Sequence, residues 1–135
     1  MILMLDTDYC IDLIGSKAFR DRSLPWIRAH EAGDLGISAI TLAELEYGVQ
    51  KSSNRERNKR ALDKFLLPLE VARFDNEAAA SYGKIRASLE KNGNTIGSLD
   101  ILIGATAVAL SIPLVTNNVK EFRRIQGLKV QQPSV

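Results

Sequence analysis

Short apolar runs alternate along this chain with longer segments in which apolar residues recur at helical spacing. Runs of this length between turn residues are typical of strands, and the last of them reads as an edge strand. The expected strands are 2–5, 35–38, 70–74, 112–116 and 129–131. Because strands alternate with helices, the pattern predicts an α/β fold, with helices covering both faces of a mainly parallel sheet.

The helical segments are bounded by residues that start or stop helices. The expected helices are 9–14, 24–32, 41–50, 55–67, 76–91 and 98–110. Gly15 and Pro68 are placed to end two of them. The helix at 24–32 is predicted with Ser23 as its cap and Pro25 in its first turn. The helix at 98–110 is apolar on nearly every face, so we expect it in the core.

Three acids lie beside strongly apolar segments that are far apart in the chain. Asp6 follows the first strand, Glu44 lies early in the helix after the second, and Asp100 lies in the first turn of the core helix. Ligands of open parallel sheets bind at the carboxyl ends of the strands, where all three acids are expected. Close carboxylates repel one another unless a cation neutralises them, and oxygen ligands favour a hard divalent ion.

Each acid also has a simpler structural explanation. Thr41 and Glu44 match a capping box, Asp100 complements the helix dipole, and Asp6 or Asp8 can cap the first helix. Taken singly, these explanations are the better ones. The functional interpretation gains weight because all three acids fall at the one rim where α/β proteins bind ligands.

Length, charge and cysteine content restrict the setting of this site. The 135 residues fit one domain, 1–135, and a net charge of +2 does not by itself indicate nucleic acid. The single cysteine, Cys10, cannot form an internal disulfide, which favours a reducing cytoplasm. Asp6, Asp8 and Asp12 interrupt the apolar start, and the apolar run 101–115 is short of the roughly 20 residues that cross a bilayer, so we expect neither signal peptide nor membrane segment.

Basic residues are placed differently in two parts of the chain. The helix at 55–67 is rich in Lys and Arg, but Glu56 and Asp63 interleave, as on a solvated surface. Lys120, Arg123 and Arg124 come just after the polar turn that ends the 112–116 strand, so we expect them at the rim, where they can hold phosphates.

Five segments of the chain form a recognisable set. They are Met4-Leu5-Asp6-Thr7-Asp8, Ile40-Thr41-Leu42-Ala43-Glu44-Leu45, Ser98-Leu99-Asp100-Ile101-Leu102-Ile103, Leu114-Val115-Thr116-Asn117-Asn118 and the closing segment 121–128. Together they resemble the PIN-domain ribonucleases, most closely the VapC toxins of toxin–antitoxin operons. Each motif alone is weak. Their order and spacing make the combination specific, and the likeness covers essentially the whole chain, which implies a single PIN-like α/β/α domain.

The resemblance implies an endoribonuclease that uses Mg²⁺ or Mn²⁺ to activate water. It places Asp6, Glu44 and Asp100 at the family's invariant acidic positions, as metal ligands. Asn118 stands where many relatives carry a fourth aspartate. Asp8 stands at a position that is usually asparagine in this family and often assists the site, and here it adds a charge; whether that charge compensates for Asn118 is open on the sequence. By the same resemblance, Thr116 and Asn117 orient a ligand or water.

The resemblance also implies partners. Similar toxins are neutralised by a VapB-type antitoxin, form homodimers and toxin–antitoxin hetero-oligomers, and cleave structured RNA such as tRNA. DNA is reached only through the antitoxin, and no membrane is involved.

Three other functions stay open on the sequence. Asp6-Thr7-Asp8 after an apolar strand also resembles the nucleophile motif of haloacid-dehalogenase-like phosphatases, with Asp6 as nucleophile. A receiver-type signalling domain fits the length, although the order of the acids does not match. A catalytically silent PIN-type module that binds RNA or antitoxin is the third.

Overall fold

A computed structural model describes residues 1–133 of the chain, which form one α/β/α sandwich around a five-stranded, all-parallel sheet of order β3-β2-β1-β4-β5. The strands are β1 (Leu3–Leu5), β2 (Leu35–Ser38), β3 (Glu70–Ala72), β4 (Leu114–Val115) and β5 (Val130–Gln131). The helices are α1 (Thr7–Gly15), α2 (Lys17–Arg28), α3 (Ala39–Lys51), α4 (Arg55–Leu66), α5 (Asn76–Lys91), α6 (Ser98–Leu110) and α7 (Val119–Phe122). The predicted fold class is therefore confirmed.

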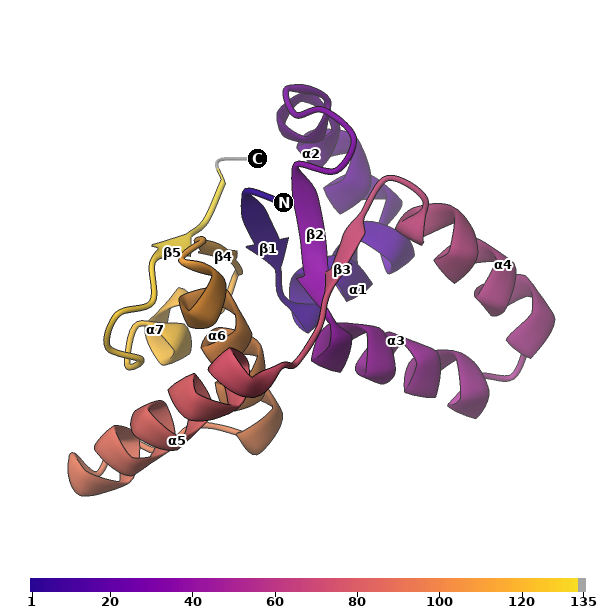
Figure 1. The fold of residues 1–135 in the computed structure, drawn as a ribbon. Helices are drawn as coiled ribbons and strands as arrows, with labels where there is room; N and C mark the ends of the chain where they lie inside the picture. The colour runs from indigo at the N-terminus through magenta and orange to yellow at the C-terminus, as the bar shows by residue number, and fades with distance from the viewer. Residues whose placement is uncertain (134–135) are drawn as a thin grey trace.

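The central strand β1 is buried on both faces. Leu3 and Leu5 belong to an apolar cluster packed under α1 to α4, whereas Met4 between them belongs to a second cluster formed with α5, α6 and α7. Successive side chains of a strand point to opposite faces, so three consecutive apolar residues supply both layers. Figure 1 shows α6 and α7 on one side of the sheet and α1, α2 and α4 on the other.

The C-terminal segment packs tightly against the core helix α6. A Cβ atom at Gly104 would lie 2.5 Å from Ile125 Cδ1, so only glycine lets Ile125 approach this closely. Ile125 is buried, and so is Phe122 at the end of α7. These contacts hold α7 beside the amino end of α6, where Asp100 lies.

The helix expected at 24–32 was placed wrongly. Ser16 accepts a hydrogen bond from the Phe19 amide, so α2 begins at Lys17 and Pro25 lies inside it. The helix ends at Arg28, before the predicted boundary. Phe19 packs on the core beside Trp26 and Ile27, which explains why the helix includes the polar stretch that the prediction omitted.

Strand β2 and helices α5 and α6 have the predicted bounds, and the other predicted elements are found with shifted ends. Strand β3 stops at Ala72 and β4 covers only Leu114–Val115, each shorter than expected, while Lys129 lies just outside β5. Strand ends are the least predictable part of a sheet because hydrogen bonding stops where neighbours diverge. Among residues 1–133, no helix is both long and apolar enough to span a membrane.

Candidate active site

Asp6 lies at the carboxyl end of β1 and is 3% exposed. Its Oδ1 accepts a hydrogen bond from the Tyr9 amide (2.8 Å), which caps α1, and its Oδ2 accepts one from the Thr116 hydroxyl after β4. Burial raises the pKa of Asp6 to about 6, although both hydrogen bonds lower it. The predicted capping role is thus correct for Oδ1 of Asp6, whereas Oδ2 links the end of β1 to the end of β4 through Thr116.

Glu44 does not form the capping box that its spacing with Thr41 predicted. Helix α3 begins two residues earlier than expected, and its cap is Ser38, which accepts a hydrogen bond from the Thr41 amide (3.1 Å). The Glu44 carboxylate instead accepts a hydrogen bond from the Thr7 hydroxyl (2.6 Å). Glu44 is therefore held toward the start of α1, where Asp6 lies.

Asp100 lies in the first turn of α6, whose cap residue Gly97 makes no side-chain hydrogen bond. The pKa of Asp100 is raised to about 7, first by burial, then by the charge of Glu121 and by that of Asp6. The charge of Glu44 acts in the same direction, so all three predicted acids lie close enough to influence one carboxyl group. The helix dipole favours the charged form of Asp100, so burial and the neighbouring acids outweigh the dipole at this position.

Glu121 is a fourth acid at this site that the sequence interpretation missed. Its charge raises the pKa of Asp100, and it accepts hydrogen bonds from the Asn118 side-chain amide (2.7 Å) and, more weakly, from the Gly97 backbone amide (3.4 Å). A signal was present, because Glu121 follows Asn118 by three residues in the segment that begins at the same rim. Asn118, which stands where many relatives carry a fourth aspartate, thus orients the carboxylate of Glu121.

The remaining predicted site residues take different places. Thr116 binds Asp6 and also accepts a hydrogen bond from the Asn118 amide (2.9 Å), which makes it a link between β1 and the turn after β4. Asn117 is exposed, and its side-chain oxygen accepts a hydrogen bond from Gln132 (3.2 Å). Asp8 is exposed in the first turn of α1 and contributes its charge to the raised pKa of Asp6.

The three predicted cations on and after α7 are all exposed. The Arg124 guanidinium donates to the Thr95 carbonyl (3.3 Å), which lies in the loop before α6. Lys120 and Arg123 share the short segment that carries Glu121. Cations therefore border the acid cluster on the side of α7.

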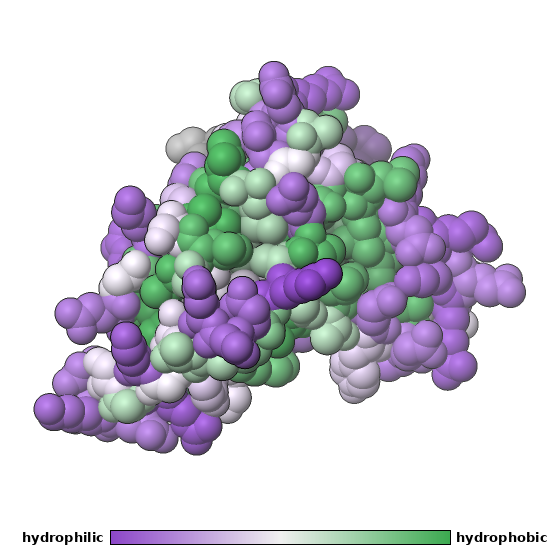
Figure 2. Space-filling model, viewed as in Figure 1, coloured by the Kyte–Doolittle hydropathy of each residue, from purple (hydrophilic) through white to green (hydrophobic). Residues whose placement is uncertain are grey.

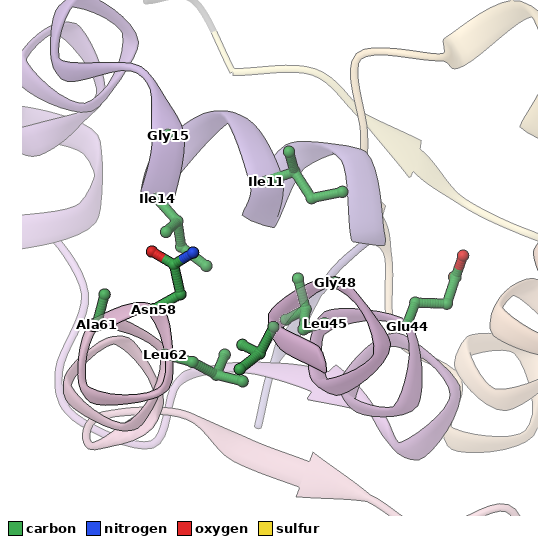
Figure 3. A pocket seen from close by; sticks show the side chains of 10 residues that line it. Ile11, Ile14, Gly15, Glu44, Leu45, Gly48, Asn58, Ala61 and Leu62 are labelled. Atoms are coloured by element: carbon green, nitrogen blue, oxygen red, sulfur yellow. The ribbon is translucent and has the colours of Figure 1, made fainter. Parts of the chain in front are cut away.

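An apolar hollow of about 270 Å³ opens beside Glu44, between α1, α3 and α4. Figure 3 shows Ile11, Ile14, Leu45 and Leu62 around it, with the Glu44 carboxylate pointing away from them at one end. Apolar surface beside an acidic cluster favours a ligand that carries an apolar group next to a cation.

The donor chemistry of the cluster fits a divalent metal ion. Asp6, Glu44, Asp100 and Glu121 supply only carboxylate oxygens, the ligands that Mg²⁺ and Mn²⁺ prefer. Among residues 1–133, no group of three or more Asp, Glu, His or Cys side chains is arranged to hold an ion as it stands. Hydrogen bonds from Thr7, Thr116 and Asn118 orient three of the carboxylates, and a carboxylate that accepts such a bond still has lone pairs for a metal ion.

Comparison with known proteins identifies the family to which this fold and site belong. Residues 3–128 match the profile of the PIN domain. The chain is 42% identical over 128 residues to Ribonuclease VapC2 of Rickettsia felis, and 38% identical over 128 residues to the tRNA(fMet)-specific endonuclease VapC of Salmonella typhimurium, in each case covering 95% of both chains. The chain therefore belongs to the PIN-domain family, in its VapC branch.

Solved structures give the same result. The chain of VapBC2 from Rickettsia felis, crystallised with a DNA fragment of its promoter, superposes with a TM-score of 0.87 at 39% identity and covers 99% of this chain and 100% of that one. DNA-bound VapBC from Salmonella typhimurium superposes with a TM-score of 0.86 at 36% identity, covering 98% of both chains. The resemblance drawn from the sequence motifs is confirmed.

Proposed function

We propose that this protein is a divalent-metal-dependent endoribonuclease, the toxin of a VapBC-type toxin–antitoxin pair. The observation that carries the proposal is the cluster of four acids at the carboxyl ends of β1, β2 and β4, two of which have pKa values raised to about 6 and about 7. Uncompensated carboxylates at a ligand-binding rim are typical of a site that is completed by a cation. Relatives with this fold are named ribonucleases and endonucleases.

The side chains of the cluster have separate tasks in this mechanism. Asp6, Asp100, Glu44 and Glu121 would hold Mg²⁺ or Mn²⁺, and the bound ion supplies a Lewis acid that lowers the pKa of water for attack on phosphorus. Thr116 fixes the Asp6 carboxylate and Thr7 fixes Glu44. Asn118 orients Glu121 in the same way. Lys120 and Arg123 neutralise phosphates of the RNA on either side of the bond that is cut.

Two of the alternatives lose their support. A phosphatase of the haloacid-dehalogenase type and a receiver-type signalling domain are not supported, because the chain belongs to the PIN-domain family and its named relatives are ribonucleases and endonucleases. A ribonuclease mechanism with two imidazoles of one chain is also excluded, because His30 is the only histidine of the sequence. A silent PIN module differs from the proposed enzyme only in activity.

A cleavage assay with the purified protein separates the proposed enzyme from the silent module. With Mg²⁺ present, we expect it to cut total RNA and, more selectively, folded tRNA, because two relatives are named tRNA(fMet)-specific endonucleases. The products should carry a 5′ phosphate. If the RNA stays intact after incubation with the protein and saturating Mg²⁺, and also with saturating Mn²⁺, the result would favour the silent module.

We propose that a VapB-type antitoxin occupies the apolar hollow and the acid cluster together. The hollow lies between α1, α3 and α4 and ends at Glu44, so one extended segment can bury apolar side chains there and direct a Lys or Arg to the carboxylates. Such a cation competes with the metal. The relatives' structures are toxin–antitoxin complexes, which is consistent with this arrangement.

Replacing Ile11 with aspartate should weaken antitoxin binding about tenfold or more, because it puts a charge into the apolar hollow. Ile11 is 50% exposed, so the fold should tolerate the change. Leu110→Asp is the matched control, since Leu110 is 46% exposed at the far end of α6. Titration calorimetry with the antitoxin from the same operon measures the difference. Equal affinity of the two variants would exclude the hollow as the binding site, and both should still cleave RNA.

We infer a homodimer, for which the apolar area over the β3 edge of the sheet in Figure 2 is the best surface; Val71 on β3 and Leu67 before it are 41% and 83% exposed.

We also place the protein in the cytoplasm, where its RNA substrates are and where buried Cys10 stays reduced.

A further inference from the structure

A second, smaller hollow lies between α5 and the segment that follows α7. It has a volume of about 140 Å³, and its lining residues are Lys84, Ile85, Ser88, Leu89, Arg124 and Gln126. Ile85 and Leu89 are buried and form its floor, while Lys84 and Arg124 are exposed at its margin. No acid lines it, so its polar groups are two cations, a hydroxyl and an amide.

The two cations are not neutralised by the protein. Within residues 1–133, neither Lys84 nor Arg124 forms an ion pair, and the one hydrogen bond of the Arg124 side chain goes to a backbone carbonyl. Some other cations of the described chain are neutralised. Lys59 on α4 is paired with both Glu46 and Asp63, and Arg86 on the other flank of α5 is paired with Glu90. The hollow is thus a place where positive charge remains available for a ligand.

The hollow is connected to the acid cluster by a short series of contacts. Arg124 follows Glu121 by three residues, and its guanidinium is bonded to Thr95, two residues before Gly97. The Gly97 amide is in turn bonded to Glu121. Exposed Lys120 and Arg123 lie on the same segment. A polyanion bound at the acids can therefore continue along this segment, past its exposed cations, toward the hollow.

We propose that this hollow binds a backbone phosphate of the RNA substrate, a few nucleotides from the bond that is cut. Lys84 and Ser88 are one helical turn apart on α5 and face the same side, so both can donate to one phosphate group, with Arg124 opposite. The apolar floor suits the ribose or base of the same nucleotide. This inference rests on the proposed nuclease function and adds that the enzyme requires RNA that extends past the cleavage site.

The test measures RNA binding by Lys84→Gln in the inactive Asp100→Asn protein. Lys129→Gln is the matched control: Lys129 is also exposed and without an ion pair among the described residues, but it precedes β5, at the end of the strand opposite the acids. With a labelled single-stranded oligoribonucleotide, we expect Lys84→Gln to weaken binding about threefold to tenfold and to reduce the slope of log K against log salt by about 0.7, the loss of one phosphate contact. Lys129→Gln should change neither.

Two further measurements make the result specific. The difference between Lys84→Gln and Lys129→Gln should vanish with a dinucleotide, because the proposal places the hollow a few nucleotides beyond the bond that is cut. Ser88→Asp should weaken the binding of the long oligonucleotide more than Ser88→Ala, because it places an anion against the phosphate.

Three outcomes are distinguishable. Equal affinities and salt slopes for Lys84→Gln and Lys129→Gln, in a protein whose wild type cleaves RNA, overturn the phosphate site and leave the nuclease intact. If the wild type neither cleaves nor binds RNA, the proposed function falls and this inference falls with it. A loss confined to Lys84→Gln that is equally large for the dinucleotide places Lys84 at the cleavage site itself and also contradicts the proposal.

Discussion

Replacing Asp100 with asparagine should reduce RNA cleavage by about a thousandfold, because a bound metal ion supplies several kcal/mol of transition-state stabilisation, about 4 kcal/mol for that factor. The fold should survive, since asparagine has the same shape and Asp100 makes no hydrogen bond that caps α6. Single-turnover cleavage of one tRNA substrate measures the effect.

Glu77→Gln is the control for this variant. Glu77 is also an acid in the first turn of a helix, α5, but it is exposed and belongs to no cluster. If an acid at a helix start matters only through the helix dipole, both variants should lose little activity and a little stability. If Asp100 is part of a metal site, only its replacement should stop cleavage. Near-normal activity of Asp100→Asn would show that Asp100 is not a ligand.

Removing divalent ions should abolish cleavage and make stability depend on pH. Asp6 and Asp100 have pKa values of about 6 and about 7 in the folded protein, above the ordinary 3.8. The folded state therefore binds more protons than the unfolded state between these values, so the free energy of unfolding in EDTA should fall as the pH rises from about 4 to 7 and then level off. Asp6 is buried, but Asp100 is half exposed, so solvent screening limits the total to about 2–4 kcal/mol.

Mg²⁺ should reverse this dependence, because the ion binds the deprotonated carboxylates and stabilises the folded state most at high pH. Urea unfolding at pH 5 and pH 8, with EDTA or with Mg²⁺, gives the four values required. The double variant Asp6→Asn, Asp100→Asn should lose the fall in EDTA and gain nothing from Mg²⁺. A wild type that is more stable at pH 8 than the double variant in EDTA would contradict the uncompensated cluster.

The sequence was sufficient to place three of the acids at one rim. Asp6 and Asp100 adjoin apolar runs whose lengths identify a buried strand and a core helix, and parallel strands bring their carboxyl ends together. Glu44 was assigned to the same rim for the right reason, although its neighbour Thr41 suggested a cap that the structure gives to Ser38. Ser38 and Thr41 are both residues that commonly cap a helix, and they lie three positions apart. The capping pattern alone therefore could not decide which of them begins α3.

What the sequence could not show depends on contacts between distant segments. Glu121 joins the acids because Ile125 packs into the space left by Gly104 and so holds α7 against α6. No local sequence pattern predicts that α7 and α6 come this close. The bond between Glu44 and Thr7 likewise links two helices through side chains 37 residues apart. The hollow beside Lys84 is formed by α5 and the segment after α7, which are also distant in sequence.

Manganese binding tests the central claim most directly, because Mn²⁺ is visible by electron paramagnetic resonance and prefers the same oxygen ligands as Mg²⁺. The account predicts saturable uptake of Mn²⁺ by the wild type and by Glu77→Gln, with uptake lost in Asp6→Asn and in Asp100→Asn. A wild type that takes up no Mn²⁺, or four proteins that bind it equally, would contradict a metal site built from these acids.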